Sequence, residues 1–224
     1  MSVIDAVVVD GDNTLWKGST AEALGKAYLV KAVRELKLYK AANCTFRTAR
    51  ANFMINIRGD PEEIPYGQKK FYDVMIDNDI GMKEEMHSII GKHIRKNIIE
   101  KIGGIVDYYV TGDTPVFLST MAGSTTADCA REGFRLTDTV SNTERFDSSG
   151  KLIGFDAKII CGESKLALTE EALDKYGLRI RNCMVIGDSI HDIPMLESAK
   201  IAMASPFSSE KVLALKRIVR LVKE

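Results

Sequence analysis

Cysteine is scarce in this sequence, and the few thiols are far apart. Four cysteines occur among 224 residues, at positions 44, 129, 161 and 183. They have neither the close spacing of a zinc knuckle nor the density of a disulfide framework. We therefore expect reduced thiols.

A surplus of charge is missing as well. The 31 basic residues balance the 31 acidic residues, so the formal net charge at pH 7 is zero. This balance provides no overall electrostatic attraction for nucleic acid or for an anionic membrane surface. We expect neither as a partner, and the sequence leaves the oligomeric state open.

Long hydrophobic runs are also absent, although hydrophobic residues make up 45% of the chain. No stretch reaches the length that spans a membrane. The N-terminal segment MSVIDAVVVD has no positively charged region and carries an acid within its apolar run, which argues against a signal peptide. The composition predicts a cytoplasmic globular protein with a sizeable core.

The hydrophobic pattern that is present divides the chain into zones. Residues 3–9 are nearly all apolar and β-branched, as in a parallel strand that is buried on both faces. Residues 18–103 contain no convincing strand, and isoleucines recur there every fourth residue, at positions 90, 94, 98 and 102. We expect this second zone to be all-helical.

The zone after about residue 110 alternates between short apolar strands and helices. Within it, residues 139–156 differ, because Asp147-Ser148-Ser149-Gly150 separates two short runs like the turn of a hairpin. Alternating strands and helices predict a parallel sheet that is covered on both faces. The expected elements are strands at 116–119, 183–186 and 201–204, and helices at 125–132, from about 192, and over 212–222.

Together the zones predict an α/β protein built on a doubly wound, Rossmann-like parallel sheet with a small β-hairpin. Residues 1–17 and 104–224 would form this core, and residues 18–103 would form an inserted all-helical cap. A cap that follows the first strand directly can close over the ligand crevice and exclude water.

Acidic residues follow two of the expected strands. The first strand runs into Asp10 and Asp12, and the strand CMVI leads to Asp188 and Asp192. Ligands of open α/β sheets bind beyond the carboxyl ends of the strands, so we expect these carboxylates to converge on one crevice. Converging carboxylates need a cation, and hard oxygen ligands favour Mg²⁺. The alternative, that the aspartates only begin turns or cap helices, explains one strand end more easily than two.

Four short motifs resemble those of the haloacid dehalogenase-like phosphatases. The sequence DGDNT at residues 10–14 is similar to the Asp-x-Asp-x-Thr signature that follows the first strand in that family. VFLST supplies the hydroxyl residue of the second motif, Ser119, and GESK supplies the lysine of the third, Lys165. GDSIHD matches the last motif with Asp188 and Asp192, and all four motifs occur in the order of the family.

The resemblance covers residues 1–16 and about 110–222, and it is greatest to the phosphoserine phosphatase-like branch. That branch also has a hairpin similar to SNTERFDSSGKLIGFD and a run similar to GDSIHDIPML. Its members usually have Asn at the position of His191, and paired glycines where this chain has Thr120-Met121. Specificity for phosphoserine is therefore open.

The resemblance implies a phosphomonoester hydrolase that acts on a small phosphorylated metabolite. Asp10 would be the nucleophile that forms an aspartyl-phosphate, and Asp12 would protonate the leaving group and then activate water. Asp10, Asp188 and the backbone carbonyl of Asp12 would hold Mg²⁺. The alternatives are a phosphotransferase or phosphomutase with the same intermediate, and a non-catalytic binding module on the same fold.

Lys165 and the Ser119 hydroxyl would meet the remaining charge of the phosphoryl oxygens. Lys158 competes with Lys165, because the sequence does not set the loop register. A shift of the strand by one residue would exchange Ser119 for Thr120. Asp192 is expected to orient Lys165 or a metal-bound water.

Other polar residues are expected to support the site or to recognise the substrate. Thr14 would hydrogen-bond the loop backbone. His191 would replace a neutral amide contact or add a titrating charge. The cap residues able to recognise an amine or a carboxylate are Glu22, Arg47, Arg50 and Arg58.

Overall fold

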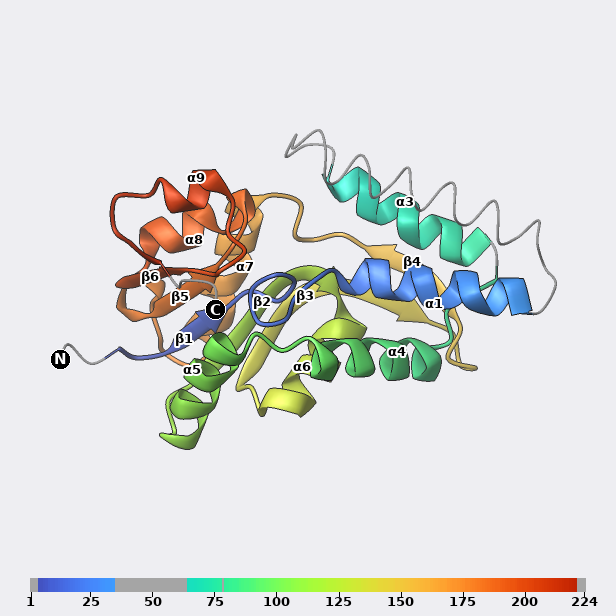
Figure 1. Cartoon of the computed structure of the whole chain (residues 1–224), viewed down its shortest axis with the longest axis horizontal. Coiled ribbons are helices and arrows are strands. Elements are labelled where there is room, and N and C mark those ends of the chain that lie inside the picture. The colour runs from blue at the N-terminus through green and yellow to red at the C-terminus, as the bar shows by residue number, and fades with distance from the viewer. Residues whose placement is uncertain (1–3, 35–63, 78, 221–224) are drawn as a thin grey trace.

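One seven-stranded sheet forms the centre of the protein. The computed structural model describes residues 4–34, 64–77 and 79–220 (Figure 1). The strand order is β4-β3-β2-β1-β5-β6-β7, and adjacent strands are parallel except for the antiparallel hairpin of β3 and β4. The strands are β1 (Val7–Val9), β2 (Val116–Gly123), β3 (Asp138–Phe146), β4 (Leu152–Asp156), β5 (Met184–Gly187), β6 (Ile201–Ala204) and β7 (Ile218–Arg220).

Helices cover both faces of this sheet. In Figure 1, α7 and α8 lie on one side of the strands, and α5 and α6 lie on the other. Two short 3₁₀ turns, η1 (Ile180–Asn182) and η2 (Ile190–Asp192), flank β5. The described helices are α1 (Thr20–Arg34), α3 (Ile64–Asp77), α4 (Lys83–Lys96), α5 (Glu100–Thr111), α6 (Ser124–Phe134), α7 (Gly162–Asp174), α8 (Ile193–Ser198) and α9 (Glu210–Leu213).

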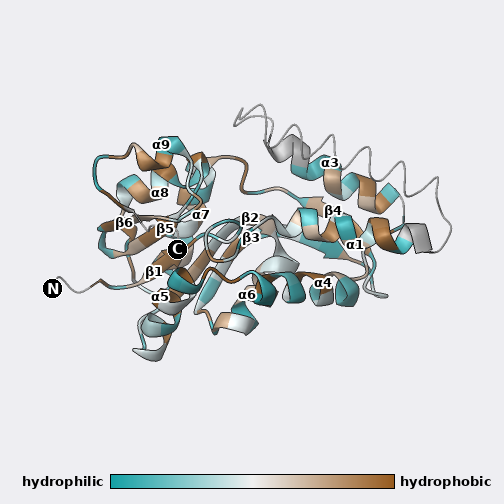
Figure 2. Cartoon of the chain, viewed as in Figure 1, coloured by the Kyte–Doolittle hydropathy of each residue, from teal (hydrophilic) through white to brown (hydrophobic). Residues whose placement is uncertain are grey.

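Strand β1 is buried because its side chains alternate between two hydrophobic cores. Val7 and Val9 pack in the same core as Ile102 of α5, whereas Val8 packs in the other core with Leu173 of α7. All three valines are 0% exposed. Burying a side chain of this size contributes about 1.5–3 kcal/mol. The central strands are correspondingly hydrophobic in Figure 2, which agrees with the predicted doubly wound sheet.

The three strands predicted in the last zone correspond to β2, β5 and β6. The helix predicted over 212–222 is wrong over residues 214–220, because α9 ends at Leu213 and β7 follows; residues 221 and 222 lie outside the described residues. Ile218 and Val219 pair with Ala202 and Met203 of β6, so this segment extends the sheet. The apolar spacing over 212–222 is helical, but the adjacent Ile218 and Val219 are β-branched residues that also suit a short strand at the open edge of β6.

The zone predicted as a helical cap contains α1, α3, α4 and the beginning of α5 among the described residues. Helix α1 packs on α4, α4 packs on α6, and α3 packs on the hairpin strand β4. The predicted boundary at residues 103 and 104 falls inside the continuous helix α5, so the domain limits stay a prediction. None of the described helices is long and apolar enough to cross a membrane.

Asn142 links the hairpin to the loop that precedes α7. Its side chain is fully buried, and its Oδ1 accepts hydrogen bonds from the backbone N–H groups of Lys158 and Ile159, both at 2.8 Å. Its Nδ2 donates to the backbone oxygen of Met121 at 2.7 Å. One buried amide therefore provides partners for backbone groups of three residues on two separate segments.

Replacing this amide should destabilise the fold. We expect Asn142→Ala to lower the free energy of unfolding by about 3 kcal/mol, because three backbone groups lose their partner. For a chain of this length the melting temperature should fall by roughly 6–12 °C in thermal unfolding followed by circular dichroism. The control is Asn182→Ala, which removes only an exposed hydrogen bond to Asp5. Equal melting temperatures for the two variants would contradict the prediction.

Candidate active site

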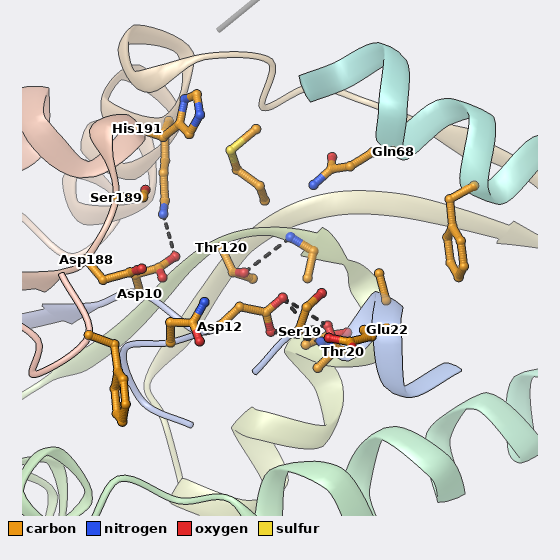
Figure 3. Close-up of a pocket in the computed structure, with 18 of the residues that line it drawn as sticks. Asp10, Asp12, Ser19, Thr20, Glu22, Gln68, Thr120, Asp188, Ser189 and His191 are labelled. Atoms are coloured by element: carbon orange, nitrogen blue, oxygen red, sulfur yellow. Dashed lines mark hydrogen bonds and ion pairs between the residues drawn. The ribbon is translucent and has the colours of Figure 1, made fainter. Parts of the chain in front are cut away.

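A cavity of about 450 Å³ lies at the carboxyl ends of β1, β2 and β5. The loop after β1, the start of α1, helix α3, the end of β2 and the loop after β5 all contribute to its wall. Figure 3 shows Asp10 and Asp188 next to each other, with Gln68 pointing toward the cavity from α3. This is the crevice at which the strand-end carboxylates were expected to converge.

Lys165 lies between two carboxylates at the base of the cavity. Its Nζ is 2.6 Å from Asp10 Oδ1 and 2.6 Å from Asp192 Oδ1, and its side chain is 1% exposed. Burial disfavours the ammonium, but the two carboxylates raise the pKa of Lys165 above its ordinary value and keep it charged. Lys165 lines the cavity, whereas the competing candidate Lys158 is exposed and does not line it.

Asp10 and Asp192 differ in what surrounds their carboxylates. Burial raises the pKa of Asp10 to about 6, with Lys165 opposing the shift and Asp192 adding to it. Burial would also raise the pKa of Asp192, but Lys165 and Ser189 hold it below its usual value. Asp192 Oδ2 accepts from the Ser189 N–H and Oγ, both at 2.9 Å, and from the Asp188 N–H at 3.1 Å. Both oxygens of Asp192 are therefore engaged by the protein.

Asp188 completes a cluster of carboxylates. One oxygen from each of Asp10, Asp188 and Asp192 can be chosen so that all three lie within 4.8 Å of one another. Burial, followed by the charges of Asp10 and Asp192, raises the pKa of Asp188 well above its usual value. Thr14 Oγ1 donates to Asp188 Oδ1 at 2.9 Å, so Thr14 supports the carboxylate directly. The cluster has the hard oxygen donors that suit Mg²⁺.

The Asp12 side chain turns away from this cluster. Its carboxylate accepts a hydrogen bond from Trp16 Nε1 at 2.8 Å. It also accepts one from the Thr20 N–H at 3.2 Å, at the start of α1 (Figure 3). Burial raises the pKa of Asp12, and these two hydrogen bonds oppose the shift. The expected contribution of Asp12 to metal binding was its backbone carbonyl, and the carboxylate is not part of the described cluster.

A tight turn after β1 produces this separation of the two aspartates. The Gly11 carbonyl accepts from the N–H groups of Thr14, Leu15 and Trp16. Asn13 adopts φ 60°, in the left-handed region that asparagine tolerates better than most residues. A Cβ at position 11 would lie 2.8 Å from the Trp16 ring, so glycine is required there.

Two adjacent hydroxyl residues in the middle of β2, Ser119 and Thr120, face opposite sides of the sheet. Ser119 is fully buried, and its Oγ is 2.8 Å from Thr169 Oγ1 of α7. It does not line the cavity, whereas Thr120 does. Successive side chains of a strand point to opposite faces, so only one of the pair can face the site. The expected position of Ser119 at the cavity is therefore corrected to Thr120.

Other predicted residues lie at the cavity wall or outside the described chain. His191 lines the wall and is buried, which lowers its pKa. Glu22 lines it at the start of α1 and forms an exposed ion pair with Lys26. The positions of Arg47, Arg50 and Arg58 lie outside the described residues.

Sequence reasoning missed several residues of the wall. Gln68, Phe71 and Tyr72 of α3 line the cavity, although no local motif marks them. Trp16, which does not line the wall, is the second residue after the first motif, and its indole N–H can only donate a hydrogen bond. That property could have indicated its bond to Asp12.

Comparisons with known proteins agree with this arrangement. A family model described as haloacid dehalogenase-like hydrolase matches residues 4–200. A search of curated proteins returned no match.

Several solved structures share the fold. A phosphoserine phosphatase, solved as an analogue of its phospho-aspartyl intermediate, is 15% identical, with 99% of this chain and 94% of that chain covered and a TM-score of 0.67. A protein of unknown function from Bordetella pertussis Tohama I is 14% identical, with 89% and 88% covered and a TM-score of 0.69. Cytosolic 5'-nucleotidase IIIB bound to cytidine is 16% identical, with 97% and 80% covered and a TM-score of 0.66.

At these low identities the structural likeness establishes the fold alone. The family model, in contrast, spans most of the sequence, including the carboxylates that follow β1 and β5. The chain therefore belongs to the haloacid dehalogenase-like hydrolase family.

Proposed function

We propose that the protein is a Mg²⁺-dependent phosphomonoester hydrolase that works through an aspartyl-phosphate on Asp10. The observation that carries the proposal is the buried contact of Lys165 with Asp10 at the end of β1, beside Asp188 and facing the cavity. A carboxylate held by one cation and facing a cavity is suited to attack an electrophile. This function is in keeping with the hydrolase family and with phosphatases among the neighbours in fold.

The residues at the strand ends fit a bound Mg²⁺. Asp10 and Asp188 supply carboxylate oxygens, and the repulsion that raises the pKa of Asp188 would be offset by a cation. Asp192 is less suitable as a direct ligand, since the protein already engages both of its oxygens. When bound, Mg²⁺ would neutralise phosphoryl oxygens and orient the phosphate. The backbone carbonyl of Asp12 stays our proposal for a further ligand.

Asp10 would attack the phosphorus atom. One oxygen of its carboxylate would form the new bond to phosphorus. The bond from phosphorus to the leaving oxygen breaks, and the phosphoryl group is carried as an acyl-phosphate. The pKa of about 6 leaves Asp10 mainly ionised at neutral pH, as a nucleophile requires.

Asp12 would serve as the general acid and base. Burial raises its pKa, which favours the protonated form that the leaving oxygen needs. After it has given up this proton, the Asp12 carboxylate would take one from the water that attacks the aspartyl-phosphate. Release of inorganic phosphate then restores Asp10. Trp16 and Thr20 would hold the Asp12 carboxylate away from Asp10 during both steps.

Thr120 and Lys165 would bind the transferred phosphoryl group. Thr120 is at the cavity wall, so we assign it the hydroxyl role for which Ser119 was first considered. Asp192 would position Lys165 through their 2.6 Å contact. A preorganised ammonium in a buried site stabilises transition-state charge without reorganisation of solvent.

The substrate would be a small phosphorylated metabolite. The cavity volume of about 450 Å³ is in the range of small-molecule sites. A phosphoserine-like substrate is included in this class, and Glu22 is the described residue at the wall that could bind an amine. The residues that select the leaving group are expected in the inserted helices.

The first prediction for this mechanism concerns the nucleophile. Asp10→Asn should reduce hydrolysis of p-nitrophenyl phosphate in the presence of Mg²⁺ by at least about 10³-fold, because an amide cannot form the acyl-phosphate. Far-ultraviolet circular dichroism should stay unchanged. Asp5→Asn, near the start of the same strand, is the control with full activity. Substantial turnover by Asp10→Asn would remove Asp10 from the nucleophile role.

The second prediction concerns the metal. Mg²⁺ should raise the free energy of unfolding by about 2.7 kcal/mol at a concentration one hundred times its dissociation constant. The melting temperature should rise accordingly. Asp188→Asn should largely abolish this gain, since one of the two proposed carboxylate ligands is lost. Asp138→Asn, at the start of β3, should retain it. If wild type and Asp188→Asn respond equally to Mg²⁺, the metal binds elsewhere.

The third prediction separates Asp12 from Asp10. Asp12→Ala should slow hydrolysis of the acyl-phosphate by about 10²- to 10⁴-fold, because no base remains to activate water. With p-nitrophenyl phosphate, whose leaving group needs little protonation, the aspartyl-phosphate should accumulate. Rapid acid quench followed by hydroxylamine would detect it, since hydroxylamine cleaves acyl-phosphates. Turnover without any hydroxylamine-labile phosphate would instead indicate direct attack by water.

A further inference from the structure

Glu144 is a buried carboxylate that the proposed chemistry does not use. It lies on β3 and is 6% exposed. Its Oε2 accepts a hydrogen bond from the Thr125 N–H at 2.6 Å, at the start of α6. A carboxylate at this end of a helix is stabilised by the unpaired N–H groups and by the helix dipole. Glu144 therefore fixes the junction between β2 and α6.

The second oxygen of Glu144 binds a residue from the inserted helices. Tyr72 of α3 donates its hydroxyl to Glu144 Oε1 at 2.6 Å, and the contact is buried. The Tyr72 ring stacks on Phe155 of β4, with centroids 3.9 Å apart and planes inclined by 6°. Phe71 meets the same ring edge-on at 5.4 Å. Glu144 and Phe155 thus hold Tyr72 by its polar and its apolar part.

These contacts adjoin the wall of the proposed active site. Tyr72 and Phe71 line the cavity from α3, and Met121 and Ala122 line it from the end of β2. The next residue of β2 is Gly123, where a Cβ would lie 2.6 Å from the Tyr72 hydroxyl and closer still to the Glu144 carboxylate. Three parts of the chain are therefore in close contact around Gly123: the β2–α6 junction, β3 and α3.

We propose that Glu144 and Tyr72 are positioning residues, which fix α3 against the β2–α6 junction and thereby set the wall that receives the leaving group of the substrate. This inference rests on the proposed phosphatase function. Tyr72 is the residue that reaches the cavity, and Glu144 acts through it.

The chemistry of the pair supports a role beyond packing. Burying a carboxylate costs free energy that an apolar side chain at the same place would not require. What a fully hydrogen-bonded carboxylate adds is a single defined geometry, because its two oxygens have partners on separate elements. Burial, and next the nearby Glu144, raise the pKa of Tyr72 well above its usual value, so its hydroxyl remains a donor.

A second tyrosine near Glu144 provides a matched control. Tyr28 of α1 is 2% exposed, and its hydroxyl has no hydrogen-bond partner among the described residues. The charge of Glu144 contributes to the raised pKa of Tyr28, after burial and Glu85. Tyr28→Phe and Tyr72→Phe therefore remove the same atom from the surroundings of the same carboxylate, but only Tyr72→Phe breaks a bond.

The test compares a bulky and a small leaving group in steady-state kinetics with Mg²⁺. For Tyr72→Phe we expect the KM for p-nitrophenyl phosphate to rise about tenfold, because the variant loses a hydrogen bond to a charged group. The kcat should be nearly unchanged, because the contact affects substrate binding and the transition state equally. The KM for acetyl phosphate should not change, because its leaving group is too small to meet the α3 wall. Tyr28→Phe should match wild type with both substrates.

A double variant tests whether Glu144 acts through Tyr72. Glu144→Gln keeps the shape of the side chain, but its amide has only one oxygen that can accept a hydrogen bond. Glu144→Gln should raise the KM for p-nitrophenyl phosphate. The double variant with Tyr72→Phe should have a KM only slightly above that of Tyr72→Phe alone, because both changes break the same contact. Fully independent effects of the two substitutions would overturn the coupling.

The outcomes also separate this inference from the proposed function. If wild type hydrolyses both substrates but Tyr72→Phe keeps the wild-type KM values with a lowered melting temperature, the pair is only structural and the inference fails alone. A loss of kcat that is equal for both substrates would overturn it in the same way. If wild type hydrolyses neither substrate, the proposed function and this inference both fail.

Discussion

The buried ammonium of Lys165 is the constraint on which the arrangement of the site depends. It joins the end of β1 to the loop after β5, because Asp10 and Asp192 each lie 2.6 Å from its Nζ. Without this charge the carboxylates of two adjacent strands would repel each other in a buried place. The long side chain comes from α7, on one face of the sheet, and so the helix layer contributes directly to chemistry at the strand ends.

The sheet and the strand-end cluster could be predicted from the sequence because their signals are local. An apolar strand followed by DGDNT, and another followed by GDSIHD, place acids at the carboxyl end wherever the strands lie in the sheet. The hairpin was equally evident from Asp147-Ser148-Ser149-Gly150. These features depend on a few consecutive residues, and long-range packing did not alter them.

Features that depend on distant partners could not be predicted. The choice between Ser119 and Thr120 is set by which face of β2 meets α7, and two adjacent hydroxyl residues carry no such information. The strand β7 exists because β6 offers an open edge. Gln68 and Tyr72 reach the cavity only because α3 packs on β4, a contact between residues far apart in the chain.

The hydrogen bonds of Asp12 connect the proposed proton transfer to the first inserted helix. The Thr20 N–H that binds its carboxylate belongs to the first residue of α1, which packs on α4. A shift of α1 would therefore change the donors around Asp12 and with them its proton affinity. The acidity of the proposed general acid is thus coupled to the position of the first residues of α1.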